Sequence, residues 1–398
     1  MSRMPAPRLI VLLCVTGATT TVSIGAFPAL LPELGVAAGL ADWQLGAVAG
    51  AFGLARMLTN VPAGLFITHH LSRALVLAPG LTLVGALLLT AGGGFAALML
   101  GRALMGVGHT LSMLASLTAI LRQRAGPGLA SSLNAVEFSA MLGVLTGATL
   151  LTMLPRSVSW ATALLIACVP VLANLALLPA LRRALPAPGA GPRPLFARSQ
   201  AAAAPAAGAP QPAPFLGLLA VAAGAATAVS YSTVEQFAIP LRGSREFGLD
   251  RAGIARLLML SQVVDVATLL PLGALADRRG TPVVLGGVLL VFALALGLVG
   301  FGSLPLLAVG CALFGFSMAA WMLPLGILRA VTPPAQVAWR TALYRVSVDG
   351  GMFAGPFVSG LLGGSHAGVL PGVMMVIVAT IAVALLVRAR LGALPRSG

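Results

Sequence analysis

Twelve apolar stretches, each about 20 to 27 residues long, occupy almost the whole of this 398-residue chain. A helix needs about 20 apolar residues to cross the hydrocarbon core of a bilayer. The composition agrees, because 59% of the residues are hydrophobic and only 8% are charged, whereas soluble domains carry roughly 25% charged residues. The sequence therefore predicts an all-α membrane protein with twelve transmembrane helices and excludes a soluble fold.

The longest interruption of the apolar pattern is an Ala-, Pro- and Gly-rich tract at 182–213. Such low-complexity composition is typical of a flexible linker. We therefore predict an N-terminal six-helix bundle at 1–181, a cytoplasmic linker at 182–213 and a C-terminal six-helix bundle at 214–398. The spans are expected at 9–33, 43–67, 74–93, 95–121, 129–153, 159–181, 214–240, 252–276, 282–301, 304–328, 340–363 and 369–389.

The basic residues are distributed unevenly between the two sides of the membrane. All 24 are Arg, and with a cytoplasmic N-terminus 16 of them fall on the cytoplasmic side. Only four fall on the outer side, Arg156, Arg242, Arg245 and Arg251. The positive-inside rule then places both termini in the cytoplasm of a bacterial-type inner membrane. Topology, rather than a nucleic-acid partner, explains the net charge of +15.

The two halves of the sequence repeat a pattern of proline and glycine. Pro32 ends the first span and is followed 32 residues later by Gly64, while Pro240 ends the seventh span and is followed 33 residues later by Gly273. Internal duplication is common in secondary transporters, whose substrate site lies near the midplane between the repeats. The repeat therefore favours transport as the function.

A loop signature carries a resemblance to a known family. The octet from Gly273 to Gly280 reads Gly-Ala-Leu-Ala-Asp-Arg-Arg-Gly and fits the G-x-x-x-D-R-x-G signature of the major facilitator superfamily, specifically its twelve-helix drug and metabolite exporters. The first-half copy, from Gly64 to Arg73, is degenerate because Thr68 replaces the acid. The resemblance implies two pseudo-symmetric six-helix bundles, a monomer, and a cytoplasmic latch formed by Gly273, Asp277, Arg278 and Gly280. The alternative is that these arginines only set the topology.

Two further patterns resemble this family. Span four carries Arg102 followed by Gly106 and Gly108, similar to an R-x-x-x-G-x-G pattern whose arginine is associated with proton coupling. Spans five and eleven carry glycines at four-residue spacing, Gly143 with Gly147 and Gly351 with Gly355. Such glycines allow helices to approach closely in lipid.

Three acids fall near mid-depth in the predicted spans. Glu137, Asp265 and Asp349 lie roughly 12 to 17 Å from the cytoplasmic boundary, at 1.5 Å per residue. A charge at the bilayer centre costs roughly 2.5 to 3.5 kcal/mol, so buried ionisable groups are rare unless paired or used. In the fold that the resemblance implies, we expect Arg56 to pair with Asp349, and Glu137 to face Asp265 so that one carboxyl holds a proton. The alternative is a static structural pair.

Weaker candidates lie in other spans. Ser230, Tyr231, Glu235 and Gln236 form a polar patch that is expected to line the substrate cavity, although Glu235 is equally compatible with the outer water boundary. Trp321 is a candidate for the cavity wall or for packing. His109 is a candidate proton relay or a hydrogen-bonded structural residue.

The sequence contains no phosphate-binding glycine loop, metal-ligand cluster or nucleophile with its base. We therefore predict a protein that is not an enzyme and has no metal or cofactor, with protons as the coupling ion and with membrane lipid and a small molecule as partners. The cavity spans are rich in Ala, Gly, Thr and Met, which favours proton-coupled efflux of a fairly apolar or amphipathic molecule by alternating access. The alternatives are a proton-coupled importer of a metabolite or organic anion, with Arg56 and Arg102 as ligands, and a membrane sensor or assembly factor that transports nothing.

Overall fold

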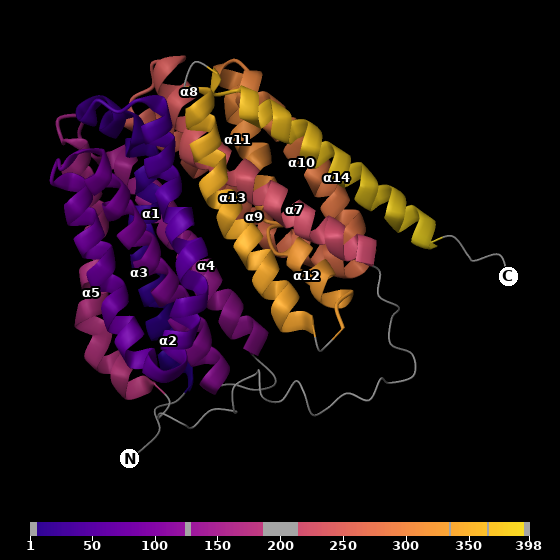
Figure 1. The fold of residues 1–398 in the computed structure, drawn as a ribbon, viewed down its shortest axis with the longest axis horizontal. Coiled ribbons are helices and arrows are strands. Elements are labelled where there is room, and N and C mark those ends of the chain that lie inside the picture. The colour runs from indigo at the N-terminus through magenta and orange to yellow at the C-terminus, as the bar shows by residue number, and fades with distance from the viewer. Residues whose placement is uncertain (1–5, 124–128, 186–213, 334–335, 364–365, 394–398) are drawn as a thin grey trace. The chain divides into compact units, whose positions relative to one another are not determined.

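The computed structural model describes residues 6–123, 129–185, 214–333, 336–363 and 366–393, and these are almost entirely helical (Figure 1). The first half contains α1 (Ala6–Ala38), α2 (Asp42–Thr90), α3 (Gly94–Gln123), α4 (Leu129–Met153) and α5 (Trp160–Ala184). The second half begins with α7 (Pro214–Thr233), the π-helical turn η1 (Val234–Ala238), α8 (Ile239–Arg245) and α9 (Arg251–Arg279). It continues with α10 (Thr281–Phe301), α11 (Leu304–Met318), α12 (Leu323–Ala330), α13 (Val337–Leu362) and α14 (Val369–Ala393). Most of the predicted linker lies outside the described residues.

Ten helical segments of the described chain are long and apolar enough to cross a membrane. One of them, α2, has 49 residues and would be about 73 Å long if it were straight, more than twice the roughly 30 Å hydrocarbon core. It therefore contains the second and third predicted spans. The eleventh predicted span corresponds to α13, which carries Arg340, Arg345 and Asp349 and is not among the ten. The predicted all-helical fold is confirmed, whereas the count of twelve is not reproduced exactly by this measure.

The predicted loop at 68–73 is wrong, because α2 is helical on both sides of a kink at His70. His70 has φ −129° and ψ 41°, which depart from helical values and produce the kink. Arg122, at the end of α3, donates a hydrogen bond from Nη2 to the carbonyl oxygen of Thr68 at 2.7 Å. A basic side chain from a neighbouring helix thus satisfies a carbonyl beside the kink.

In the second half, the equivalent junction joins α9 to α10, and the chain turns there at Gly280. We expected the eighth span to end at 276 and a tight turn from Asp277 to Gly280, but α9 continues through Arg279, so Asp277 and Arg278 lie in its last turn. Gly280 has φ 88°, and its N–H donates to the carbonyl of Ala276 at 3.0 Å. A side chain would strain this backbone conformation, which explains a glycine at the end of the octet.

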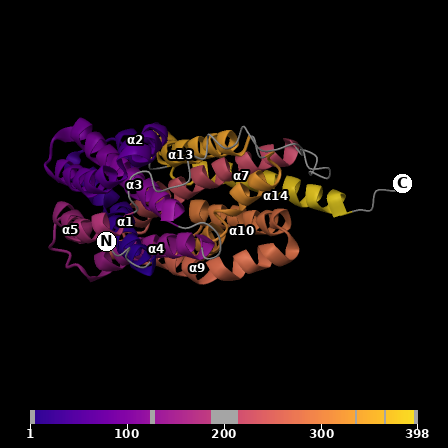
Figure 2. The ribbon, with the colours of Figure 1, turned by 90° about the horizontal axis from the view of Figure 1, so that it is seen from below.

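The described helices form two compact units. The first comprises residues 1–192 together with 240–259, and the second comprises 193–239 together with 260–398. In the first unit α1 lies beside α4, and in the second α7 lies beside α13, as Figures 1 and 2 both show. The segment 240–259 belongs to the first unit although it follows η1 in the sequence.

Glycines permit both of these helix pairs. A Cβ atom at Gly143 would lie 2.1 Å from the carbonyl oxygen of Ala18, and one at Gly147 would lie 2.0 Å from that of Val22. In the second unit, a Cβ at Gly355 would lie 2.3 Å from Ser232 Oγ and 2.5 Å from the carbonyl oxygen of Val229. The close approach predicted from the glycine spacing is therefore confirmed in both units.

Candidate functional site

Glu235 lies in the π-helical turn η1, which interrupts the seventh predicted span. Within η1, the N–H of Ile239 donates to the carbonyl of Val234, five residues earlier. Pro240 follows directly, has no N–H to donate, and its ring crowds the carbonyl four residues before it. The wider turn relieves that crowding, and π-turns of this kind are frequent at functional sites. The sequence predicted an unbroken span here, although Pro240 was the available signal.

The carboxylate of Glu235 is held by three neutral donors. Tyr231 donates its hydroxyl to Oε1 at 2.8 Å, Gln262 of α9 donates Nε2 to Oε2 at 3.1 Å, and Gln236 donates Nε2 to Oε1 at 3.5 Å. Glu235 is only 2% exposed. Within the described part of the chain, Glu235 forms no ion pair. The Glu235 carboxylate is therefore buried, and the donors that contact it among the described residues are neutral.

Aromatic rings border this acid. The ring of Tyr231 stacks on Phe314 of α11 with centroids 6.0 Å apart, and it meets Trp321 edge-on at 5.6 Å. Phe314 in turn contacts Phe292 of α10 at 5.9 Å. Four of the predicted cavity residues, Tyr231, Glu235, Gln236 and Trp321, are thus brought together in one unit, with Gln262 as a contributor that the sequence did not predict.

The tenth predicted span is broken at the same place. α11 ends at Met318 and α12 begins at Leu323. In the intervening turn, Ala320 donates to Ser317 and Trp321 donates to Met318, each three residues back, so the α-helical pattern is lost. Non-helical backbone at membrane depth is tolerated where it is buried in protein or lines a cavity. The break thus places Trp321 beside the Glu235 site.

Buried hydroxyl groups continue the polar patch along α7. Ser230 and Thr233 are fully buried, and their hydroxyl oxygens have no hydrogen-bond partner among the described residues. Ser232 is satisfied differently, because it donates to the carbonyl of Gly351 on α13 at 3.1 Å. An unsatisfied buried hydroxyl costs about 1 to 3 kcal/mol. Such groups are typical of a site that is completed by a ligand or water.

In the first unit, Arg102 is packed between aromatic rings. Its guanidinium carbon lies 3.7 Å from the ring centroid of Phe27 on α1 and 4.8 Å from that of Phe52 on α2. Phe52 also contacts His109, with ring centroids 5.4 Å apart, and Arg56 at 5.9 Å. These cation–π contacts help to offset the cost of burying the guanidinium, which is 1% exposed as a residue.

The three mid-depth acids lie in helices as predicted. Asp349 of α13 and Asp265 of α9 are buried, and Glu137 of α4 is half-buried. The proposed pairings, Arg56 with Asp349 and Glu137 with Asp265, each join residues of different compact units, and they stay predictions. The latch at Asp277 likewise stays a prediction, with the acid now placed in the last turn of α9.

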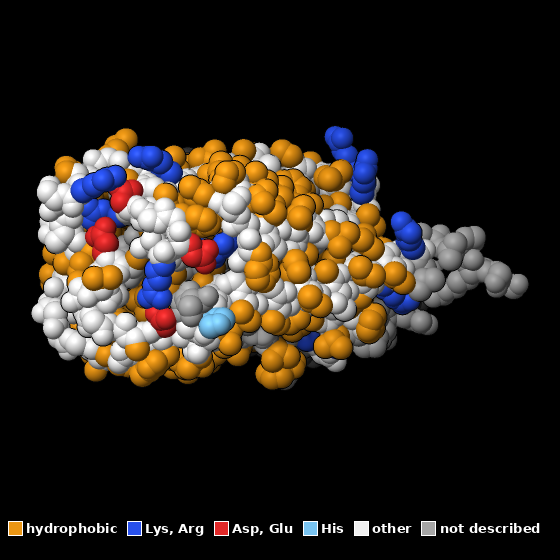
Figure 3. Space-filling view, turned by 90° about the horizontal axis from the view of Figure 1, so that it is seen from above, with side chains coloured by type: hydrophobic (Ala, Val, Ile, Leu, Met, Phe, Trp, Pro, Cys, Tyr) orange, Lys and Arg blue, Asp and Glu red, His pale blue; other side chains and the backbone are white. Residues whose placement is uncertain are grey.

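All four arginines predicted on the outer side form ion pairs. On the face drawn in Figure 3, acidic side chains lie beside basic ones. The pairs are Arg156 with Asp250 (2.6 Å), Arg242 with Glu246 (2.6 Å), Arg245 with Asp42 (2.7 Å) and Arg251 with Glu33 (3.4 Å). We call this group the outer ion-pair cluster. It lies within the first compact unit.

Arg251 makes the most extensive contacts in this cluster. Besides Glu33, its guanidinium donates to the carbonyl oxygens of Pro155 at 2.9 Å and of Val158 at 3.0 Å, both in the connection between α4 and α5. Its side chain is 4% exposed. A buried, multiply bonded guanidinium of this kind ties the start of α9 to two other parts of the first unit.

Asp250 caps the N-terminus of α9. Its Oδ1 accepts a hydrogen bond from the backbone N–H of Gly253 at 2.9 Å. This hydrogen bond lowers the pKa of the Asp250 carboxyl below its ordinary value of 3.8, and the charge of Arg156 lowers it further. A carboxylate at a helix N-terminus is stabilised both by the free N–H groups and by the helix dipole.

The pH dependence of stability should reflect this cap. Because the pKa of Asp250 is lower in the folded chain, its carboxylate contributes full stability above about pH 4, and the contribution is lost as the pH falls through the lowered value. Asp250→Asn keeps the capping oxygen but removes the charge. We expect the difference in melting temperature between wild type and Asp250→Asn, measured in detergent, to be present at pH 6 and to shrink below pH 3.8. A difference that is constant from pH 6 to pH 3 would contradict this assignment.

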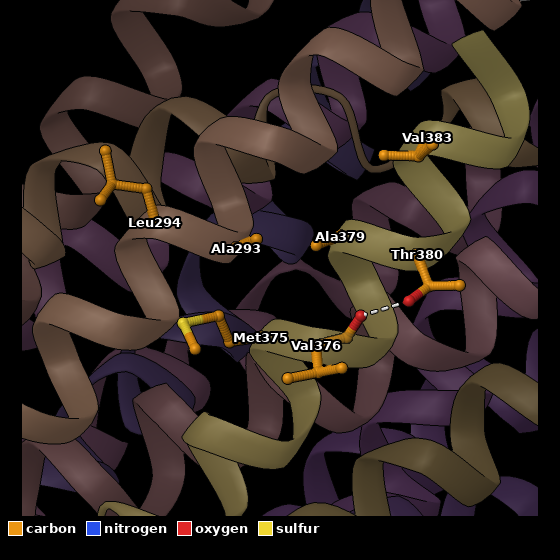
Figure 4. A pocket seen from close by; sticks show the side chains of 7 residues that line it. All are labelled: Ala293, Leu294, Met375, Val376, Ala379, Thr380 and Val383. Atoms are coloured by element: carbon orange, nitrogen blue, oxygen red, sulfur yellow. Dashed lines mark hydrogen bonds between the residues drawn. The ribbon is translucent and has the colours of Figure 1, made fainter. Parts of the chain in front are cut away.

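An apolar groove of about 590 Å³ lies between α10 and α14 (Figure 4). Its lining contains no charged side chain, and the hydroxyl of its one Thr, Thr380, already donates to the carbonyl of Val376 at 2.8 Å. The groove offers a polar ligand no free donor from that side chain, and none of the predicted site residues lines it. The Glu235 site is therefore the better candidate. The lining residues are Ala293, Leu294, Met375, Val376, Ala379, Thr380 and Val383.

Solved structures match this chain along most of its length. The nucleoside transporter NupG aligns with 96% of this chain and 99% of its own, at TM-score 0.72 and 13% identity. A mutant of the peptide transporter POT in complex with alafosfalin aligns with 96% of this chain and 94% of its own, at TM-score 0.70 and 15% identity. A bacterial homolog of the human lysosomal transporter Spinster, inward-facing and unoccupied, aligns with 98% of this chain and 96% of its own, at TM-score 0.68 and 14% identity. No family model and no curated protein sequence matches.

These likenesses decide the fold. The chain has the major facilitator fold. The prediction from the Gly273–Gly280 octet and the internal repeat is thereby confirmed for the architecture. The matched structures are those of transporters. At 13–15% identity the likeness extends to the fold alone.

Proposed function

We propose that this protein is a secondary active transporter that exports a small, fairly apolar or amphipathic molecule in exchange for protons by alternating access. The observation that supports the proposal best is the set of ionisable residues buried inside apolar helices. Arg102, Glu235, Asp265 and Asp349 are all 6% exposed or less. Each would cost free energy in lipid unless it is paired or used in transport.

Proton coupling fits the chemistry of these groups. The described residues contain no group of three or more His, Cys, Asp or Glu that is arranged to hold a metal ion, whereas buried carboxyls can take up and release protons one at a time. We keep Glu137, Asp265, Asp349, Arg102 and His109 as candidates for coupling. The bacterial inner membrane with cytoplasmic termini remains our expectation for its location.

Export is favoured over import of an anion by the position of Arg102. An anion ligand has to reach the guanidinium, but Phe27 lies 3.7 Å from it and Phe52 lies 4.8 Å from it. We infer that Arg102 positions helices α1, α2 and α3 rather than binding a substrate. If uptake of anionic substrates alone requires Arg102, import becomes the better interpretation.

Neutralising the predicted proton site tests the proposal. We expect Asp265→Asn and Glu137→Gln each to abolish or strongly reduce pH-driven transport, because a side-chain amide does not titrate and so cannot carry the coupled proton. Purified protein in liposomes, with a pH-sensitive dye inside, reports proton flux on addition of ligands first selected by thermal shift. If both variants retain wild-type pH-driven flux, these two acids are not the coupling site. If the wild type shows no ligand-driven flux with any ligand of a broad panel, a sensor or assembly factor becomes the better interpretation.

A further inference from the structure

The groove between α10 and α14 has small residues at its base and larger apolar side chains along its edges. Ala293 of α10 and Ala379 of α14 lie between the two helices (Figure 4). Leu294, Val376 and Val383 are each more than half exposed. The alanines leave the hollow, and the larger side chains border it. Because these side chains are apolar, the groove suits a hydrocarbon chain rather than a polar ligand.

The groove leads toward the end of α14 that carries arginine. Val376, Val383 and Arg390 follow one another at intervals of seven residues, which is about two helical turns, so they lie on one face of α14. On α10, Gly287 lies two turns before Leu294, and a Cβ atom added to it would meet no neighbour within 4 Å. The space beside the groove face of α10 therefore stays open in the same direction.

The contacts between α10 and α14 fix which of their ends lie together. A Cβ atom at Gly286 would lie 2.7 Å from Cγ of Leu386, and one at Gly297 would lie 2.9 Å from Sδ of Met375. Later residues of α10 thus contact earlier residues of α14, so the two helices are antiparallel. The first turn of α10 therefore lies beside the last turns of α14.

Basic side chains gather at this end of the groove, within the second compact unit. Arg278 and Arg279 end α9 directly before α10, and Arg388 and Arg390 lie in the last turns of α14. All four are exposed, and none forms an ion pair with another residue that the structure describes. Four arginines and one neighbouring acid, Asp277, leave an excess of three positive charges. This end of the groove is therefore suited to an anion.

The distance from the groove to these arginines matches one leaflet of a bilayer. Arg390 follows Met375 by 15 residues, a rise of about 22 Å along a helix. One leaflet with its head groups is about 20 to 22 Å thick, half of a bilayer of about 40 to 45 Å. On the predicted topology, Arg390 lies at the cytoplasmic surface and Met375 near the middle of the membrane. A lipid with an acyl chain in the groove would thus place its phosphate at the level of Arg279 and Arg390.

We propose that this groove binds an anionic glycerophospholipid of the cytoplasmic leaflet, with one acyl chain between α10 and α14 and the phosphate against Arg279 and Arg390. The planar guanidinium of arginine binds phosphate through parallel N–H donors. Basic pockets between transmembrane helices on the cytoplasmic side bind anionic head groups. A zwitterionic lipid would fill the groove equally well but would gain less from the excess positive charge. The inference goes beyond the proposed function, because it concerns a lipid site rather than the transported molecule.

The test is lipid binding to the purified full-length protein in detergent, measured by native mass spectrometry. The probes are phosphatidylglycerol and phosphatidylcholine with identical acyl chains, which differ in head-group charge. We expect the wild type to bind phosphatidylglycerol with a Kd about tenfold lower than that for phosphatidylcholine. The double variant Arg279→Gln and Arg390→Gln should raise the Kd for phosphatidylglycerol about tenfold or more, because each basic side chain near an anionic lipid contributes about fivefold. The Kd for phosphatidylcholine should change much less.

Matched variants separate this site from the basic surface in general. Arg182→Gln with Arg183→Gln removes two exposed arginines from the end of α5, which does not line the groove, and should leave the Kd for phosphatidylglycerol unchanged. Ala379→Leu fills the base of the groove and should raise the Kd for both lipids about threefold or more, because the acyl chain loses its contacts between the helices. Ala176→Leu, at an exposed site on α5, should not. The arginine variants keep the inference testable if Ala379→Leu does not fold.

Several results would overturn the inference. They are equal wild-type Kd values for the two lipids, an unchanged Kd in the Arg279 and Arg390 double variant or in Ala379→Leu, and an equal loss in the α5 double variant. A second copy of the chain bound in place of lipid, and lost in Ala379→Leu, would also overturn it. None of these results depends on transport. Absence of ligand-driven proton flux in liposomes would overturn the proposed function and leave the lipid site intact.

Discussion

Gly147→Ala is expected to lower the melting temperature of the purified protein strongly. An ideal Cβ at Gly147 would lie 2.0 Å from the carbonyl oxygen of Val22 and 2.8 Å from the backbone nitrogen of Ala26, both on α1. Backbone atoms cannot rotate away as a flexible side chain can, so α1 and α4 must separate. Overpacking of this kind typically lowers the free energy of unfolding by about 1 to 3 kcal/mol. Because the clash is with backbone atoms, we expect Gly147→Ala to lie at the upper end of that range. Thermal unfolding in detergent, followed by circular dichroism, measures the change.

Gly287→Ala is the matched control for this substitution. Gly287 lies in α10, where an added Cβ has no neighbour within 4 Å. Alanine is also a better helix former than glycine by about 1 kcal/mol. We therefore expect an unchanged or slightly higher melting temperature. Equal losses for the two variants would contradict a close contact between α1 and α4 at Gly147.

This contact also shows how far the sequence could predict packing. The spacing of Gly143 and Gly147, and of Gly351 and Gly355, predicted that another helix approaches each pair closely, and both contacts are present. The pattern did not identify the partners as α1 and α7. Small residues reveal that a neighbour is near, because they leave room for it, but they carry no information on which helix fills that room.

The interruptions inside the spans were harder to predict than the spans. Hydropathy is averaged over about twenty residues. It therefore does not show interruptions as short as η1 and the turn between Met318 and Leu323. Pro240 predicts the end of a span, whereas in the structure it follows directly on a wider helical turn. The Glu235 site depends on both interruptions. The sequence therefore predicted Tyr231, Glu235, Gln236 and Trp321 as site residues but not Gln262, which only tertiary packing brings to the carboxylate.

Turns were misplaced for a related reason. The segments Thr68–Arg73 and Asp277–Gly280 are polar and follow apolar stretches, and this pattern predicts a loop at each. A helix continues as long as each residue accepts helical backbone angles, and only Gly280, with φ 88°, and His70, with φ −129°, depart from them. Polarity marks where the chain leaves lipid, whereas backbone angles mark where the helix ends.

Removal of the Arg251 guanidinium is expected to have a large effect on the first unit. Arg251→Gln loses the ion pair with Glu33 and the hydrogen bonds to the carbonyls of Pro155 and Val158. Hydrogen bonds to charged groups contribute about 1.5 to 3 kcal/mol, and their loss leaves buried acceptors unsatisfied. Because Glu33 is half-exposed, water compensates part of that loss. We expect a lower melting temperature and faster hydrogen exchange of backbone amides in 240–259.

Arg245→Gln is the control that distinguishes burial from charge. It removes the same charge from the same outer ion-pair cluster, but both Arg245 and Asp42 are more exposed to water than Arg251 is. Exposed ion pairs contribute about 0 to 1 kcal/mol, so this variant should be close to wild type. Raised salt should reduce the small effect of Arg245→Gln further and leave the effect of Arg251→Gln largely intact, because buried pairs are screened less. If the two variants lose equal stability and share one salt dependence, Arg251 acts only through its charge, and segment 240–259 is not held to the first unit by its hydrogen bonds.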